Sequence, residues 1–265
     1  MTLAEARTEL GGRAALESTL PGLAEWARVR DWRVAQLNKL SHVEIFLDST
    51  LDAEQILEFG ADRVALATGA AWRKDGVGRW HTTAFEGCRR ANVFTPDDVM
   101  RGVLPSSPVV VFDDDHYYMG SVIAEALRRA GRDVTLVTPD GNVSAWGELT
   151  DERVRAQTRL LELGVTIEVS AVLESMGDDE AVLACAYTGR TRAIPAASAV
   201  VVTSRQPRDA LFYELCDRIE ITRVGDCGAP GVIATAVFAG HRYARQLDAE
   251  VGDVPFLRER ATAPS

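Results

Sequence analysis

The sequence predicts an α/β fold in which helices cover parallel sheets. Short apolar runs alternate with amphipathic stretches along most of the 265 residues, a pattern typical of β–α–β crossovers. The alternation occurs twice, and its second copy, at about 108–203, lies inside the first. A chain of this length can bury a core in each of two units. We therefore expect two nested Rossmann-like nucleotide-binding domains, the first formed by residues 1–106 and 205–265 and the second by residues 107–204.

The elements of the first domain follow from local patterns. Apolar runs predict strands at 1–6, 42–48 and 61–69, and the last of these, "ADRVALATG", is expected to be buried. Apolar residues at helical spacing predict a helix over 22–40, and Gly60 ends a shorter helix that begins at Asp52. Residues 7–13 are expected to form a loop, and "TPDD" at 95–98 starts another helix.

The second domain begins after "PSSP" at 105–108, which is a boundary signal. The stretch "VVVFDDDHYYMGSVIAEALRRAGRDVTLV", 109–137, indicates a strand, a loop, a helix and a strand. A helix is expected at 152–164, followed by strands with a hairpin. The first domain resumes with a strand at 219–226 and a helix at 232–248, and residues 258–265 are expected to be a frayed terminus.

Composition argues against several function classes. The formal net charge of −10 disfavours nucleic acid and anionic membranes as partners, because both require basic surfaces. No apolar run approaches the ~20 residues of a membrane span. The acidic start lacks the apolar stretch of a secretory signal. Four cysteines without a C-x-x-C pair favour free thiols in a cytoplasmic protein and predict no metal site.

Glu5 and the "LGGR" that follows it are candidate nucleotide contacts. An acid that ends the second strand of a dinucleotide-binding fold accepts hydrogen bonds from ribose hydroxyls. Gly11 and Gly12 would let the backbone pass close to a nucleotide, and Arg13 could meet a phosphate. The same residues also fit a solvated acid and an ordinary glycine turn.

Two later stretches add candidates at strand ends. Ala67, Thr68 and Gly69 are small residues that could leave space for a ligand, although an ordinary turn explains them equally well. Asp226 follows a strand and precedes a Gly/Pro loop and a helix that starts near Val232. The free N–H groups of that helix start favour negative charge, so we expect Asp226 to bind ligand hydroxyls and not phosphate.

The loop "DDDHYYMG" carries aspartates where a dinucleotide-binding loop has glycines. We expect Asp113, Asp114 and Asp115 to repel a pyrophosphate, and Tyr117 and Tyr118 to fill its place. A loop histidine such as His116 could act as a base, but local hydrogen bonding is the favoured interpretation. The sequence therefore predicts no catalytic residue.

These motifs resemble the C-terminal half of the trimethylamine and histamine dehydrogenases, relatives of old yellow enzyme and dienoyl-CoA reductase. The resemblance covers nearly the whole chain, and "DHYYMG" and "RVGDCGAPGVIATAVFAG" are its most specific parts. It implies two nested domains of the glutathione-reductase type, with ADP or FAD in the first. Glu5, Gly12, Thr68 and Asp226 fall at matching nucleotide-contacting positions. It also implies an N-terminal barrel that carries FMN and an iron–sulfur cluster, and electron transfer to a protein acceptor such as an electron-transfer flavoprotein.

The sequence departs from this family in two respects. The first strand, glycine loop and first helix of the first domain have no counterpart in it, and neither have the barrel and its cluster cysteines. We expect a fragment of a longer protein, or a chain that a partner completes, with a loose first domain beside an ordered second one.

Three functions remain open at this point. The leading hypothesis is the nucleotide-binding part of an amine dehydrogenase-like flavoprotein that binds an adenine nucleotide and possesses no catalytic residues of its own. The alternatives are a FAD-dependent NAD(P)H reductase of the dienoyl-CoA reductase type and a non-catalytic scaffold or docking module. A homodimer is compatible with each of them.

Overall fold

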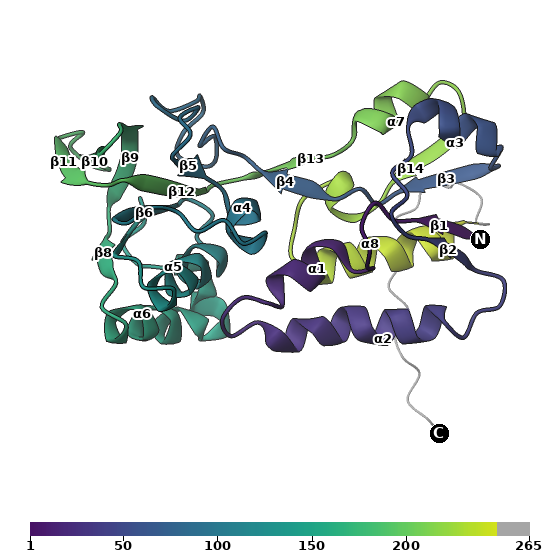
Figure 1. Cartoon of the computed structure of the whole chain (residues 1–265), viewed down its shortest axis with the longest axis horizontal. Helices are drawn as coiled ribbons and strands as arrows, with labels where there is room; N and C mark the ends of the chain where they lie inside the picture. The colour runs from purple at the N-terminus through teal and green to yellow at the C-terminus, as the bar shows by residue number, and fades with distance from the viewer. Residues whose placement is uncertain (248–265) are drawn as a thin grey trace.

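The computed structural model describes residues 1–247, and it has two lobes. Figure 1 shows one lobe that carries β5 to β12 and another that carries β1, β2, β3 and β14. An antiparallel pair joins them, formed by β4 (Ala70–Trp72) and β13 (Arg205–Pro207). The predicted frayed terminus at 258–265, and the last residue of the helix predicted at 232–248, lie outside the described residues.

A five-stranded parallel sheet organises the larger lobe. Its order is β5 (Val93–Phe94), β12 (Ser198–Val202), β6 (Val109–Asp113), β7 (Val134–Val137) and β8 (Thr166–Glu168). All four neighbouring pairs are parallel. The expected α/β fold with a parallel sheet is therefore confirmed. β5 comes from the stretch before residue 107, so this sheet extends beyond the predicted second domain.

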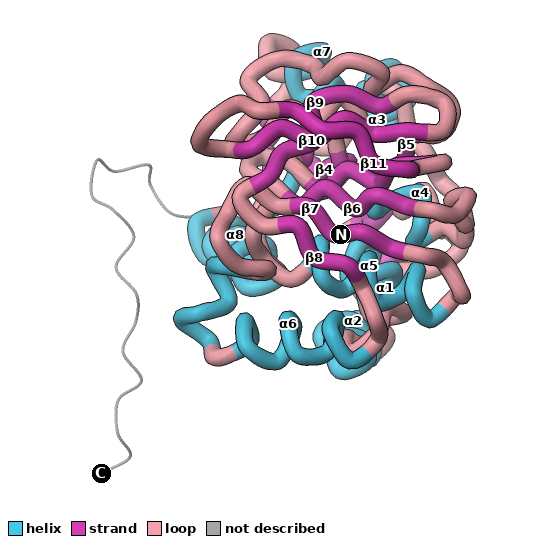
Figure 2. Tube along the Cα trace, turned by 90° about the vertical axis from the view of Figure 1, so that its left-hand side faces the viewer, coloured by secondary structure: helices cyan, strands magenta, loops and turns pink. Residues whose placement is uncertain are grey.

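Both faces of this sheet are covered (Figure 2). Val109 and Val111 pack in the cluster formed with α5 (Met119–Arg129) and α6 (Glu152–Glu162). Val110 and Phe112, which alternate with them, pack in the cluster shared with a three-stranded antiparallel sheet. That sheet consists of β9 (Ala171–Met176), β10 (Glu180–Cys185) and β11 (Thr191–Pro195). Burial on two faces explains why the strands of the large sheet are continuous apolar runs.

The smaller lobe contains two separate parallel pairs. β1 (Thr2–Ala4) pairs with β2 (Glu44–Phe46), and β3 (Arg63–Leu66) pairs with β14 (Glu220–Arg223). Within the described residues, no ladder joins β1 to β3. The remaining helices of this lobe are α2 (Ala27–Leu37), α3 (Ala53–Phe59), α7 (Ala210–Leu215) and α8 (Ile233–Gln246).

The expectation of a buried strand at 61–69 was wrong for most of β3. Leu66 is buried, but Arg63 and Ala65 are exposed. Val64 packs with the helices α3 and α7 on one face. A strand with one paired neighbour and one covered face buries alternate residues only.

Two short elements were not predicted at the start of the chain. α1 (Gly12–Glu17) begins inside the expected loop, and the helix expected over 22–40 divides into a 3₁₀ turn at Ala24–Trp26 and α2. Gly11 precedes α1 with φ 115°, and a Cβ atom there would lie 2.5 Å from Cδ of Arg30. Glycine is therefore required by both the backbone and the close approach of α2.

The start of α4 (Pro96–Met100) and the end of α3 follow the predicted signals. The side-chain oxygen of Asp98 accepts from the N–H and the hydroxyl of Thr95, at the start of α4. Gly60 ends α3 with φ 69°. No helix within residues 1–247 combines the length and the apolar character that a bilayer span requires.

Candidate functional site

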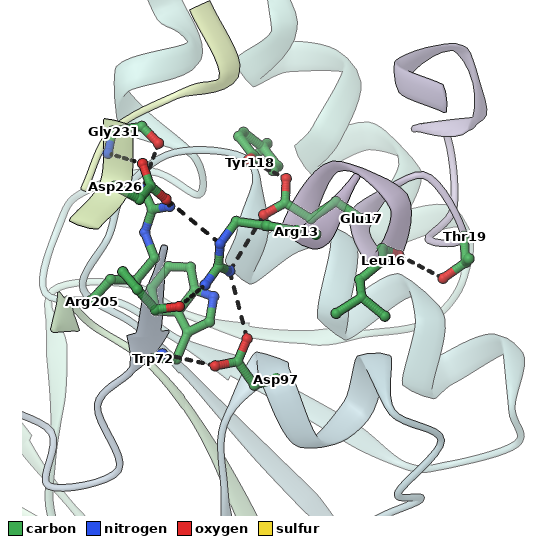
Figure 3. A network of polar contacts seen from close by, with 12 residues as sticks. Arg13, Leu16, Glu17, Thr19, Trp72, Asp97, Tyr118, Arg205, Asp226 and Gly231 are labelled. Carbon is green, nitrogen blue, oxygen red and sulfur yellow. Dashed lines mark hydrogen bonds and ion pairs between the residues drawn. The ribbon is translucent and has the colours of Figure 1, made fainter. Parts of the chain in front are cut away.

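Arg13 is the centre of a polar network between the two lobes (Figure 3). Its Nη1 atom lies 3.6 Å from Oε1 of Glu17 and 3.6 Å from Oδ1 of Asp97, and its Nε lies 3.7 Å from Oδ2 of Asp226. Its Nη2 atom donates a 2.8 Å hydrogen bond to the carbonyl of Ala70. These partners come from α1, α4, the 3₁₀ turn Gly225–Cys227 and β4, so one side chain joins four elements.

Asp226 is held by a second arginine. Arg205 donates a 2.7 Å hydrogen bond to Oδ2 of Asp226 and another of 2.7 Å to the carbonyl of Gly231. The N–H of Gly231 donates to Oδ1 of Asp226 at 3.0 Å. The carboxylate that follows β14 therefore fixes the Gly/Pro loop in front of α8, and both its oxygens are occupied by protein donors.

The ring of Trp72 lies near both guanidinium groups. The ring centroid of Trp72 is 5.9 Å from the guanidinium carbon of Arg13 and 5.4 Å from that of Arg205. Its backbone N–H donates to Oδ2 of Asp97 at 2.9 Å. Two polar atoms here are buried without a hydrogen-bond partner, Nη1 of Arg13 and Nε1 of Trp72. Nη1 of Arg13 nevertheless faces the carboxylates of Glu17 and Asp97 at 3.6 Å, so its charge is balanced within the protein.

Glu17 connects Arg13 to the other lobe. Its side chain is 2% exposed, and its Oε2 accepts a 2.9 Å hydrogen bond from the hydroxyl of Tyr118. Burial raises the pKa of Glu17, and the charge of Arg13 opposes that rise. Burial and the neighbouring Glu17 together raise the pKa of Tyr118 far above its usual value, so its phenol remains a proton donor.

The structure gathers some of the predicted site residues and separates others. Arg13 and Asp226 lie together, and the carbonyl of Ala70 that Arg13 binds directly follows the predicted stretch Ala67, Thr68 and Gly69. The hydroxyl of Thr68 donates to the carbonyl of Arg208 and lies 3.1 Å from Sγ of Cys227.

The remaining candidates lie at the start of the chain. Gly11 precedes α1 and Gly12 is its first residue. Glu5 follows β1, where its side chain accepts from the N–H of Arg7 at 3.0 Å. The nucleotide contacts expected of these residues, and of the residues gathered near Arg13, remain predictions.

Several members of the network were not among the predicted residues. Glu17 stands four residues after Arg13, a spacing that allows an ion pair on one helical face, so the sequence held a weak signal for it. Trp72, Asp97 and Arg205 come from distant parts of the chain. Arg205 and Trp72 are direct partners in the antiparallel pair of β13 and β4, and Asp97 joins them from α4, an arrangement that no local pattern indicates.

A surface cavity of about 620 Å³ lies beside the loop that follows Glu5. Its polar rim includes Thr8, Glu9 and Arg30, and its apolar wall includes Val34 and Ile45. A cavity of this volume can accommodate a nucleoside-sized group.

The aspartates of the "DDDHYYMG" loop point inward for the most part. Asp113 is fully buried, and its Oδ1 accepts from the N–H groups of Asp115 and His116 at 3.2 and 3.1 Å. Asp114 is also fully buried, and its Oδ2 accepts from the N–H groups of Arg79 and Trp80 at 2.6 and 2.8 Å. Burial raises the pKa of Asp113 to about 7.

His116 has the local environment that the sequence suggested. It is buried, with φ 62°, and its ring nitrogens lie 3.5 Å from Oδ1 of Asp114 and 3.5 Å from the hydroxyl of Thr138. Both contacts are within the same lobe. Within residues 1–247, no group of three or more His, Cys, Asp or Glu side chains is arranged to hold a metal ion.

Comparison with known proteins gives clear relatives, although no family model matches the chain. The chain is 31% identical over 281 residues to dimethylamine dehydrogenase of Hyphomicrobium sp., covering 93% of this chain and 38% of that protein. The structure of histamine dehydrogenase from Rhizobium sp. 4-9 is similar with a TM-score of 0.93 and 43% identity, over 100% of this chain and 43% of that one. The structure of 6-hydroxypseudooxynicotine amine oxidase from Pseudomonas geniculata N1 gives 0.91 and 37%, over 94% and 38%. The chain thus spans about two fifths of the length of these relatives.

Proposed function

The chain is homologous to the dimethylamine and histamine dehydrogenase family, and from this premise we propose that it is the nucleotide-binding portion of a flavin-dependent amine dehydrogenase. The similarity over the whole chain to histamine dehydrogenase, at 43% identity, is the observation that carries the proposal. In this proposal the oxidation of an amine occurs in the part of the protein that corresponds to the rest of the relatives. That part would hold FMN and an iron–sulfur cluster.

The nucleotide in this portion would be ADP or FAD, and the residues present fit such a group. Arg13 in the first turn of α1 brings a positive charge to this part of the lobe, and its Nη1 atom faces the carboxylates of Glu17 and Asp97 at 3.6 Å. A Cβ atom at Gly12 would meet nothing within 4 Å, so there is open space at the start of α1. Glu5 would accept from the ribose hydroxyls, and Thr68 and Gly69 would border the ligand. FAD would add a redox-active group, whereas ADP would have a structural role.

Electrons would leave such a protein through a protein acceptor, with an electron-transfer flavoprotein as the proposed partner. The rival NAD(P)H reductase requires a second dinucleotide site over β6 and β7. Two buried carboxylates, Asp113 and Asp114, occupy the loop where its phosphates would bind, and this disfavours that rival. A non-catalytic scaffold would bind ADP and no flavin.

Calorimetric titration with ADP and with FAD tests the proposal. We expect binding of at least one of them to the protein completed with the part that corresponds to the rest of the relatives, and a roughly tenfold weaker affinity in its Glu5→Gln variant, because a charged hydrogen bond to ribose contributes about 1–3 kcal/mol. Glu44→Gln, an exposed carboxylate at the start of β2, is the matched control and should bind like the wild type. If neither nucleotide binds, or if the two variants behave alike, the assignment is wrong.

A further inference from the structure

The loop between β4 and β5 is fastened to the larger lobe at two points. Its residues 77–81 are here called the strap. The carbonyl of Val77, at the start of the strap, accepts a 2.6 Å hydrogen bond from the hydroxyl of Ser204. At its end, Nε2 of His81 lies 2.9 Å from the carbonyl of Leu173 in β9. The strap is therefore held in place at both ends.

The five-stranded sheet changes direction between β6 and β12. From β6 the chain continues to β7 and then to β8 on one side of the sheet, whereas β12 pairs with β6 on the other side. Open parallel sheets bind their ligands beyond the carboxyl ends of the strands, at such a switch point. In this lobe those ends are Asp113 and Val202, so a ligand of the larger lobe would be expected directly beyond them.

The backbone of the strap lies at this switch point. The N–H groups of Arg79 and Trp80 donate to Oδ2 of Asp114 at 2.6 and 2.8 Å. Asp114 directly follows β6 and is fully buried. A Cβ atom at Gly78 would be 2.4 Å from the same oxygen and 2.9 Å from Cβ of Thr203, which directly follows β12. The strap thus contacts the ends of both strands, and not even a methyl group fits at position 78.

A side chain of the strap adds a further contact with the same lobe. The guanidinium carbon of Arg79 lies 3.9 Å from the ring centroid of Trp146, a favourable cation–π arrangement. The N–H of Trp146 donates to the carbonyl of His116 at 3.0 Å, which holds the indole against the loop that follows β6. The strap is therefore connected to this loop through its backbone and through its side chain.

We propose that the strap is an internal occupant of the switch point between β6 and β12, and that it closes the larger lobe to dinucleotides by taking the position a ligand would need. Repulsion by the carboxylates alone makes a different prediction, because a neutral residue at position 114 would then admit NADH. Occupancy by the strap predicts that the lobe stays closed for as long as the strap is anchored. The proposal does not depend on which nucleotide the other lobe binds.

Cleavage by trypsin after Arg79 reports release of the strap. Asp114→Ala removes the acceptor of two strap N–H groups, so we expect cleavage there to become about tenfold faster or more. Asp114→Asn keeps a side-chain oxygen for both N–H groups, so its cleavage rate should be close to that of the wild type. Asp133→Ala, which removes a carboxylate that is 80% exposed, is the matched control. Mass spectrometry of the fragments measures the rate at each site.

Gly78→Ala tests the strap without changing Asp114. The added methyl group has no space beside the carboxylate and Thr203, so the strap must move outward and cleavage after Arg79 should again become faster. Gly141→Ala is the matched control, because nothing lies within 4 Å of the Cβ position at residue 141.

Cleavage after Arg128 in α5 separates release of the strap from general unfolding. We expect faster cleavage after Arg79 with no change after Arg128. Unchanged cleavage after Arg79 in Asp114→Ala and Gly78→Ala, or equal acceleration at both sites in both variants, would overturn the proposal. NADH is also titrated into Asp114→Asn, and no binding is expected. Saturable binding while Arg79 stays protected would show that charge, and not the strap, closes the lobe. None of these outcomes bears on ADP or FAD binding by the other lobe.

Discussion

Gly120 lies against the buried carboxyl group of Asp113: a Cβ atom at position 120 would be 2.3 Å from Cγ of Asp113. Asp113 cannot move aside easily, because it is fully buried and accepts from two N–H groups of its own loop. The one glycine that remains near the expected glycine positions is thus required by an aspartate and not by a phosphate.

Gly120→Ala should destabilise the protein by about 1–3 kcal/mol, the usual cost of overpacking a buried site. Alanine normally favours a helix over glycine, so the steric effect must exceed that gain. Urea denaturation measures the change. Gly240→Ala in α8 is the matched control, since nothing lies within 4 Å of its Cβ position, and it should stabilise by up to about 1 kcal/mol. Equal effects at the two glycines would contradict the close contact.

The stability of the protein should fall as the pH rises toward neutrality. Burial raises the pKa of Asp113 to about 7, whereas an unfolded aspartate titrates near 3.8. Between these values the folded state binds a proton that the unfolded state has lost, so stability falls with increasing pH. The pKa values of Asp115 and His116 are also raised, and both act in the same direction.

Asp113→Asn should flatten this dependence. An asparagine keeps an oxygen for the two N–H groups and carries no charge to bury. We expect a melting temperature close to that of the wild type at pH 5 and a higher one at pH 8, measured by thermal unfolding in matched buffers. A wild-type melting temperature that rises from pH 5 to pH 8, or an identical pH profile in the variant, would show that Asp113 is ionised when folded.

NADH and NADPH should not bind over β6 and β7. The loop presents carboxylates and tyrosines where a pyrophosphate would need backbone N–H groups, and two of its carboxylates are bonded inside the lobe. Titration of the nicotinamide fluorescence of NADH with the protein measures this. Saturable quenching that is lost in Tyr117→Ala would reverse the conclusion and favour the reductase.

The edges of β1 and β3 that are not paired with another strand in the described residues should exchange their amide hydrogens quickly. At the ends of β1 the backbone groups of Met1 and Glu5 form hydrogen bonds with β2, so by alternation the N–H of Ala4 points to the opposite side of the strand. In β3 the carbonyl of Leu66 accepts from the N–H of Val224, so the N–H of Ala65 points away from β14. We expect weak protection at Ala4 and Ala65 and strong protection in the five-stranded sheet, for example at Val201. Hydrogen exchange read by mass spectrometry or NMR tests this in a sample shown to be monomeric. Protection at Ala4 and Ala65 equal to that at Val201 would mean that the chain closes its sheet by itself.

Sequence patterns predicted the strands and helices better than the site. The strand at 109–113 and the helix that ends near Arg129 are encoded locally by apolar periodicity, and the structure contains both. α1 was missed because it has six residues and starts at a glycine. Arg13 and Asp226 were identified from motifs, but the structure adds that carboxylates surround the arginine and that Arg205 holds the aspartate. Those contacts join residues up to about two hundred positions apart, and no window of sequence contains them.

The apolar contacts of Leu20, Leu23 and Trp26 have a consequence for how this protein can be recombined. These residues precede residue 107, yet they pack in one core with Met119 and Ile123 of the larger lobe. If residues 107–204 of a relative replaced those of this chain, the α5 of the relative would pack against Leu20, Leu23 and Trp26 of this chain and not against the residues it packs against in its own protein. The unit that could be exchanged between relatives therefore consists of two separate stretches of sequence. A functional chimera should take residues 12–26 and α5 from the same parent.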